Sequence, residues 1–262
     1  MQTIRNTARH YLPSAIRKPV GNLAGWFHQG IVRPIQGLIF DLRGGRYLID
    51  DCQIDVPTGL TSRSYRSCFL TGEYEAEECA LVREFIEPTD AVLEMGACLG
   101  VVSCVTNRRL NDKTRHVVVE GNPMVIPTLT RNRDLNSAGF TIENCAISNE
   151  PTVTFFLHPT YIVGGTVQRP TQRTVQVPGR SWKDLDETYG PFTALIMDIE
   201  GSELDVFEAS VDLLRRYRLV IVELHEWAIG QEKVERCREL LAEAGLRFMK
   251  QAGITEVWQR PS

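Results

Sequence analysis

Apolar and polar positions alternate in blocks along most of the chain, and this pattern predicts the fold class. Short apolar runs predict strands, at 91–95, 115–120, 140–145, 193–198 and 219–224. Amphipathic stretches predict helices, at 73–87, 99–110, 123–137, from 202 onward and at 231–244. Two further strands, 246–250 and 255–260, follow. Strands alternating with helices predict an α/β fold, with a mostly parallel sheet, helices on both faces and a C-terminal antiparallel strand.

The pattern weakens before residue 70, so two regions are expected. Residues 1–69 should form a basic arm with short strands and loops, and residues 70–262 the main domain. In the first region, Gly44-Gly45 is typical of a hairpin turn, near short strands at 46–50 and 53–56. A short helix is expected at 22–29.

Two details of the main domain carry separate predictions. Asn122 is a good N-cap for the helix after the second strand, although Pro127 favours a late start or a kink. The segment His158–Arg180 is rich in Gly, Pro, Thr and Gln and has no periodicity. We interpret it either as a loop that covers an acceptor, with Tyr161 and Gly164-Gly165 for stacking and mobility, or as a plain surface insertion.

Composition and charge narrow the range of partners. The chain has 262 residues, 43% hydrophobic and 24% charged, which is ordinary for one large globular domain. Its net charge of -4 does not favour nucleic acid as a partner. Residues 1–40 contain five basic residues and no acid. That arm either packs on the acidic body, is disordered, or makes peripheral contact with an anionic membrane.

The cysteines and the apolar runs bear on the compartment. Seven cysteines form no CxxC pair and show no zinc spacing, which indicates reduced thiols in a cytoplasmic protein. No run of eighteen apolar residues occurs, and no secretory signal is recognisable, although an organellar presequence stays open.

A glycine turn after the first strand of the main domain is the central motif. Glu94 is followed by Gly96 and Gly100, and Glu120 ends the next strand, twenty residues after Gly100. Such glycines let a backbone approach a nucleotide, and an acid in the position of Glu120 binds ribose hydroxyls. The third glycine of a dinucleotide fingerprint is missing, and an acid before the turn suits a cationic ligand. We therefore favour S-adenosylmethionine (SAM) over NAD as the cofactor.

Acidic residues also end the later strands. Asp198 and Glu200 follow the strand at 193–198, and Glu223 and His225 end the strand at 219–224. The ligand site of an open α/β sheet lies beyond the carboxyl ends of its strands, so these groups are candidates for the reacting end of the site. Two alternatives remain: Asp198 caps the following helix while Glu200 is solvated, and His225 is an ordinary structural histidine.

Together these motifs resemble the FkbM-type methyltransferases over about residues 70–250. The matching segments are Gly72-x-Tyr74-Glu75, Val92-Leu93-Glu94-x-Gly96-Ala97-x-x-Gly100, Glu120-Gly121-Asn122-Pro123, Asp198-Ile199-Glu200-Gly201-x-Glu203 and Val222-Glu223-Leu224-His225. The resemblance implies a class I, Rossmann-like, SAM-dependent O-methyltransferase that acts on hydroxyls of sugars, polysaccharides or natural products.

The resemblance also implies roles for single residues. The methionyl part of SAM would lie at Glu94, Gly96, Ala97 and Gly100, and the ribose at Glu120. Asn122, Asn144, Cys145 and Ala146 would flank the adenine. Asp198, Glu200 and His225 would face the acceptor, and one of them would accept its proton. The same carboxylates, with Glu223, could instead bridge a divalent cation such as magnesium.

This sequence departs from the family pattern in three places. Glu94 stands where Asp is common, Cys98 where Asn is common, and Ile196 where a Lys is common. The missing Lys leaves open a non-catalytic SAM-binding or scaffold domain. An NAD-dependent oxidoreductase is a further alternative, which the glycine spacing disfavours.

Overall fold

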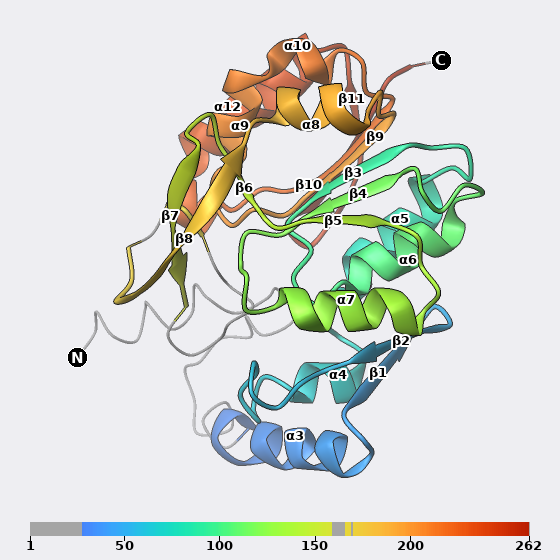
Figure 1. Cartoon of the computed structure of the whole chain (residues 1–262), viewed down its shortest axis with the longest axis vertical. Helices are drawn as coiled ribbons and strands as arrows, with labels where there is room; N and C mark the ends of the chain where they lie inside the picture. Colours follow the sequence, from blue (N-terminus) through green and yellow to red (C-terminus); the bar gives the residue numbers. More distant parts are fainter. Residues whose placement is uncertain (1–27, 159–165, 169, 262) are drawn as a thin grey trace.

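A seven-stranded sheet forms the centre of the protein, for which the computed structural model describes residues 28–158, 166–168 and 170–261. Its strands are β3 (Val92–Met95), β4 (His116–Val119), β5 (Thr141–Glu143), β9 (Ala194–Met197), β10 (Leu219–Glu223), β11 (Arg247–Ala252) and β12 (Thr255–Gln259). They lie in the order β11-β12-β10-β9-β3-β4-β5 (Figure 1). The strands from β5 to β10 are parallel, and β12 runs antiparallel to both β10 and β11. This arrangement confirms the predicted mostly parallel sheet and its C-terminal antiparallel strand.

Helices cover both faces of the sheet (Figure 1). One face carries α5 (Ala76–Phe85), α6 (Val101–Arg109) and α7 (Ile126–Leu135). The other carries α8 (Trp182–Tyr189), α9 (Glu203–Ala209), α10 (Val211–Leu214) and α12 (Gln231–Glu243), and the short α11 (Glu226–Ile229) follows β10. Alternate strand residues serve the two cores: Val92 packs with the first group of helices and Leu93 with the second.

The region before the main sheet is an N-terminal extension, as predicted, but its turn is not where the glycines suggested. It contains the π-helix η2 (His28–Val32), α3 (Arg33–Leu42), β1 (Arg46–Ile49), β2 (Cys52–Asp55) and α4 (Ser67–Thr71). The hairpin turns at Asp50 and Asp51, whose φ angles of 49° and 60° are both positive, as a type I′ turn requires. Gly44 and Gly45 instead end α3, where their amides bond to Asp41 and Phe40 carbonyls. The helix expected at 22–29 lies mostly outside the described residues.

Asparagines attach this hairpin to the main domain. The side-chain oxygen of Asn132 on α7 accepts the Asp55 amide at 2.8 Å, and that of Asn136 accepts the Gln53 amide at 2.8 Å. The opposite side of the extension is apolar and exposed, with Ile35 and Leu42 of α3 at 52% and 79% exposure. Among the described residues, no helix combines the length and apolar character needed to cross a membrane.

A small second sheet replaces part of the predicted loop 158–180. It consists of β6 (Ala146–Ile147), β7 (Thr152–Leu157) and β8 (Arg173–Arg180), in the order β6-β8-β7. The loop prediction was wrong for 173–180 because this strand is mostly exposed and includes Pro178 and Gly179, so it lacks an apolar pattern. Thr166 forms a bridge with Phe156, whereas Tyr161 and Gly164-Gly165 lie outside the described residues.

The structure also settles the start of one predicted helix and adds a helix that was not predicted. α7 begins at Ile126 after Val125, with Pro127 in its first turn, which confirms the late start. Asn122 is therefore not its N-cap; its side-chain oxygen accepts the Met124 amide at 3.0 Å in the preceding turn. α8 was not predicted, although Ser181 and Asp184 form a reciprocal capping box at its start.

Candidate active site

The glycine turn joins β3 to α6 beside the end of β9. Gly96 has a φ of +95°, and a Cβ there would lie 1.7 Å from the carbonyl oxygen of Asp198. Gly100 has a φ of +82° and precedes α6. The turn thus needs glycine at position 96 both for its backbone angle and for the close approach of β9.

We expect Gly96→Ala to lower the free energy of unfolding by about 3 kcal/mol or more, because the new methyl meets backbone at a positive φ. Urea unfolding measures the change. Gly59→Ala is the matched control, since a Cβ at Gly59 meets nothing within 4 Å. Equal unfolding midpoints for Gly96→Ala and the wild type would contradict this prediction.

Glu120 lies at the end of β4 and is fixed by the turn opposite. Its Oε2 accepts the Cys98 amide at 2.7 Å, and its Oε1 accepts the Asn122 amide at 2.6 Å. Burial raises the pKa of this carboxyl, and the Asn122 and Cys98 amides oppose the rise. The Asn144 amide group donates to the Glu120 carbonyl at 2.7 Å. Each carboxylate oxygen keeps a further lone pair for a ligand, in a fixed orientation.

Glu94 is directed away from this turn, into the space between α6 and β4. It is buried, and its two oxygens contact Ser103 Oγ at 2.5 Å and His116 Nε2 at 3.0 Å. Alternation along β3 sends residue 94 to the same side as Val92, toward α6. The carboxylate of Glu94 therefore supports the helix that follows the glycine turn.

A cavity of about 700 Å³, counting its open mouth, lies at the carboxyl edge of the sheet. Of the predicted residues, Gly96, Glu120, Asn122, Cys145, Ala146, Asp198 and Glu200 line it. Glu94, Ala97, Gly100, Asn144 and His225 do not line it. The prediction missed Cys98, Val119, Gly121, Val125, Ile147, Phe155, Thr166, Val167, Ile199 and Ser202.

Some of the missed lining residues were close to a sequence signal and others were not. Cys98 and Gly121 are neighbours of predicted residues, so the motifs themselves pointed to them. Phe155 lies on β7, where no motif indicated a site, whereas Thr166 and Val167 lie in the segment 158–180 that was predicted either to cover an acceptor or to be a plain insertion. Thr166 Oγ1 donates to the Glu200 carbonyl at 3.1 Å, which ties that connection to the end of β9.

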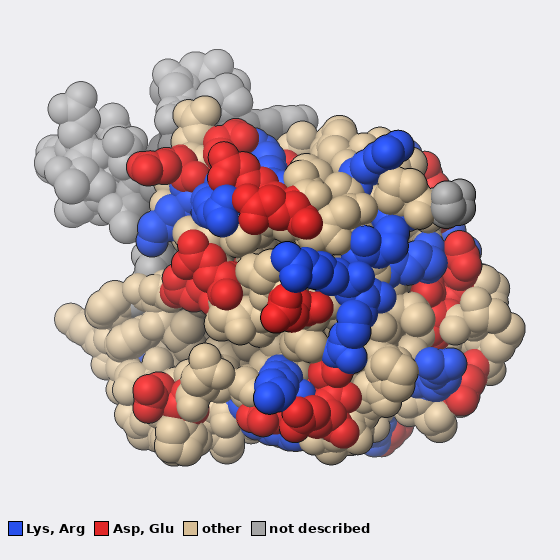
Figure 2. All heavy atoms as spheres, turned by 90° about the horizontal axis from the view of Figure 1, so that it is seen from above, with Lys and Arg blue, Asp and Glu red and all other residues tan. Residues whose placement is uncertain are grey.

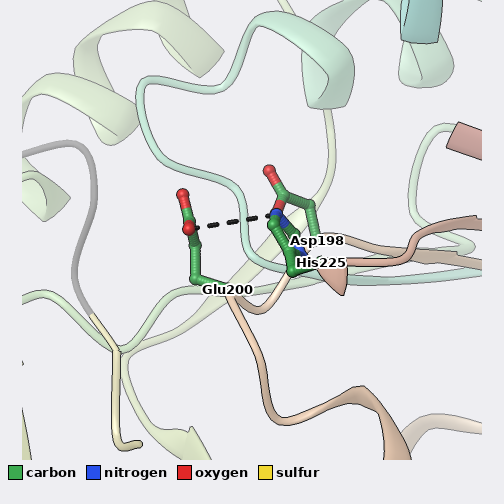
Figure 3. Close-up of side chains that lie close together, drawn as sticks. All are labelled: Asp198, Glu200 and His225. Carbon is green, nitrogen blue, oxygen red and sulfur yellow. Dashed lines mark ion pairs between the residues drawn. The ribbon is translucent and has the colours of Figure 1, made fainter. Parts of the chain in front are cut away.

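The ends of β9 and β10 bring one imidazole among four carboxylates. His225 Nε2 lies 3.4 Å from Asp198, 3.5 Å from Glu223 and 3.9 Å from Glu200. Its Nδ1 lies 2.7 Å from Oε1 of the fully buried Glu203, which also accepts the Gly201 amide at 2.9 Å. Figure 3 shows Glu200 facing His225 across an ion pair, with Asp198 drawn close to the His225 ring. The structure thus brings together the three predicted acceptor residues, and it adds Glu203.

This crowding shifts the ionisation of the group. Burial raises the pKa of Asp198 well above its usual value, and the nearby Glu223 raises it further. Burial alone would lower the pKa of His225, but Glu203, Glu223 and Glu200 outweigh it and raise that pKa. Burial also raises the pKa of Glu75, before α5, to about 8. Crowded and buried carboxyls at this edge of the sheet resist carrying further negative charge, so a positive charge close to them is favoured.

Comparisons with known proteins agree with this architecture. The family model for the methyltransferase FkbM domain matches residues 94–248. A search of curated protein sequences returns no match.

The solved structures that match this chain include a methyltransferase and a protein in complex with AdoMet. A precorrin-6y C5,15-methyltransferase from Geobacter metallireducens is 11% identical, with a TM-score of 0.46, over 71% of this chain and 87% of that one. TYW2 from M. jannaschii, in complex with AdoMet, is 11% identical, with a TM-score of 0.45, over 82% and 86%. Both likenesses are too distant to indicate what this chain methylates.

Proposed function

This chain belongs to the FkbM methyltransferase family, and on that premise we propose that this SAM-dependent enzyme methylates a hydroxyl of a sugar, a polysaccharide or a natural product. The observation that carries the proposal is one cavity lined both by Glu120, which follows β4, and by Asp198 and Glu200, which follow β9. A cofactor held at Glu120 and a hydroxyl held at Asp198 would thus share one space.

The cavity fits SAM. Glu120 has both carboxylate oxygens oriented by backbone amides, which suits the paired hydroxyls of a ribose. Cys145, Ala146, Ile147 and Phe155 form a largely apolar wall that suits a flat adenine. Gly96 brings the backbone close to the ligand, while Glu94, Ala97 and Gly100 would act by shaping the turn. Asn122 lies in the cavity, and Asn144 would hold the carbonyl of Glu120 in place.

The acceptor end would position a hydroxyl and take up its proton. SAM, when bound, supplies an activated methyl group, so the protein needs to provide proximity and a proton acceptor. A carboxylate of the cluster would accept the proton of the acceptor hydroxyl, and the methyl group that SAM supplies would leave its sulfur for the acceptor oxygen. Glu203 holds His225, which in turn orients Asp198 and Glu200.

The same features favour a small molecule or a glycan over nucleic acid as the acceptor. A phosphate backbone would be repelled by the carboxylates around His225. Figure 2 shows acidic and basic side chains interspersed on the face it draws, rather than one continuous basic surface. A cytoplasmic location and membrane contact through residues 1–40 stay predictions; the exposed apolar residues of α3 are consistent with such contact.

The decisive assay uses SAM labelled in its methyl group with a panel of saccharides and hydroxylated natural products. We expect label in a product whose new methyl group survives mild alkali and shows the proton signal of a methoxy group. Each acceptor with its free hydroxyls already methylated is the matched control and should take no label. An alkali-labile ester, an N-methyl product, or labelling of the blocked control would contradict transfer to a hydroxyl.

A further inference from the structure

The ends of β9 and β10 hold a constellation that the transfer of a methyl group does not by itself explain. Asp198, Glu200 and His225 each offer a ligand atom, and these atoms lie within 4.8 Å of one another. Three donors at that spacing can all reach one ion, since metal–ligand bonds to nitrogen and oxygen are about 2.0–2.6 Å long. We propose that Asp198, Glu200 and His225 Nε2 bind one divalent cation beside the acceptor.

The hydrogen bonding of His225 supports a ligand role. The side chain is 4% exposed, and its Nδ1 lies 2.7 Å from the Glu203 carboxylate. A histidine that binds a metal usually donates its other ring N–H to a carboxylate, which fixes the tautomer and the ring orientation. With Nδ1–H donated to Glu203, the lone pair of Nε2 points at the oxygens of Asp198 and Glu200. Glu203 is in turn held by the Gly201 amide at 2.9 Å.

The charges around the imidazole are not balanced within the described part of the chain. Asp198, Glu203 and Glu223 form no ion pair with a described lysine or arginine, and each contacts only His225 among the basic side chains. Oδ1 of Asp198 is shielded from solvent and accepts no hydrogen bond among the described residues. Glu203 and Oδ1 of Asp198 are buried, although 41% of the Asp198 side chain is exposed, and negative charge in such surroundings is costly. A dication beside Asp198 would reduce this cost.

The donor set indicates which cation suits the site. Carboxylate oxygens favour Mg²⁺ and Mn²⁺, whereas an imidazole nitrogen favours first-row transition metals. Mn²⁺ satisfies both preferences and leaves coordination positions for water and an acceptor oxygen. This inference rests on the proposed function and deepens it. The cation would hold and polarise the acceptor hydroxyl, and the displaced proton would pass to a carboxylate oxygen of the cluster that does not bind the cation.

Binding of Mn²⁺ can be measured without SAM or any acceptor. The purified protein is dialysed against EDTA and then against buffer, and is titrated with Mn²⁺ while electron paramagnetic resonance records the free ion. We expect one equivalent to bind. Glu200→Gln and Asp198→Asn should weaken binding at least tenfold, and Glu203→Gln about 10–100-fold, as for other residues that orient a ligand.

Glu226→Gln is the control, because Glu226 is an exposed acid next to His225 outside the cluster. This variant should change the affinity for Mn²⁺ by less than about twofold if specific ligands bind the ion. A larger change would indicate attraction by the overall negative charge of the surface. No binding by the wild type would overturn the inference and leave His225 as an imidazolium that neutralises the acids. Equal binding by Glu200→Gln, whose side chain reaches the surface, would also overturn it.

The two proposals fail in different ways. Methyl transfer to a hydroxyl by EDTA-treated protein that binds no Mn²⁺ would refute the cation site alone. One equivalent of Mn²⁺ on a protein that yields only esters or N-methyl products would refute the hydroxyl acceptor alone.

Discussion

Asp198→Asn is expected to lower kcat by about 10²–10⁴-fold, the range that proton transfer by a positioned group contributes. Asparagine has nearly the shape of aspartate but cannot accept the proton or carry the charge. Asp198 also lies next to Gly96 through its backbone, which the substitution leaves unchanged. His225→Gln should have an effect of the same order, because it removes the group that orients Asp198 and Glu200. Initial rates at saturating SAM and acceptor measure both variants.

The affinity for S-adenosylhomocysteine separates this loss from a general disturbance. We expect this affinity to change less than about threefold in Asp198→Asn, because the variant loses no contact to the ribose. A threefold change corresponds to about 0.7 kcal/mol of binding free energy. Glu226→Gln should keep full turnover, because Glu226 is exposed and is not one of the carboxylates around His225. If both Asp198→Asn and His225→Gln keep full turnover, the assignment of the acceptor end is wrong.

Glu120→Ala is expected to weaken binding of S-adenosylhomocysteine by about 100-fold or more. Hydrogen bonds to a charged group are worth about 1.5–3 kcal/mol each, and the variant loses two to the ribose. It also releases the Cys98 and Asn122 amides, so the glycine turn loses its anchor on β4. Calorimetric titration measures the affinity directly.

Two further variants test whether the loss of affinity comes from the carboxylate of Glu120. Glu120→Gln keeps the size of the side chain, but its NH₂ group would face a backbone N–H, of Cys98 or Asn122, that donates in the wild type. This variant should therefore also bind S-adenosylhomocysteine weakly. Glu150→Gln, an exposed acid before β7, should bind as tightly as the wild type. Wild-type affinity in Glu120→Ala would show that the cofactor lies elsewhere in the cavity.

The central strands were predictable because they are buried on both faces. β3, β4 and β9 are buried at every position, and such strands are continuous apolar runs that interrupt the helical pattern. The strand β8 of the small sheet was not predictable in the same way. Seven of its eight positions are exposed or half-buried, so its partner β7 and not its own composition makes it a strand.

The motifs located the site but did not set the direction of each side chain. Glu120 and Asp198 line the cavity as the motifs predicted. Glu94 has equally suitable chemistry, yet the pleat of β3 turns it toward Ser103 and His116. Neighbouring residues on a strand point to opposite faces of the sheet, and spacing in the sequence does not show which of the two faces holds the ligand.

The sequence by itself determined the α/β class, the succession of strands and helices along the chain, and the acids that end the central strands. Periodicity and composition are local properties, so they can be recognised without the tertiary structure. Only the tertiary structure decided that four carboxylates surround His225. That convergence requires β9 and β10 to lie side by side, with Met197 opposite Val222, and Glu203 to begin the helix behind them. Contacts between residues so far apart in the chain depend on how strands pair and helices pack, and no local pattern records them.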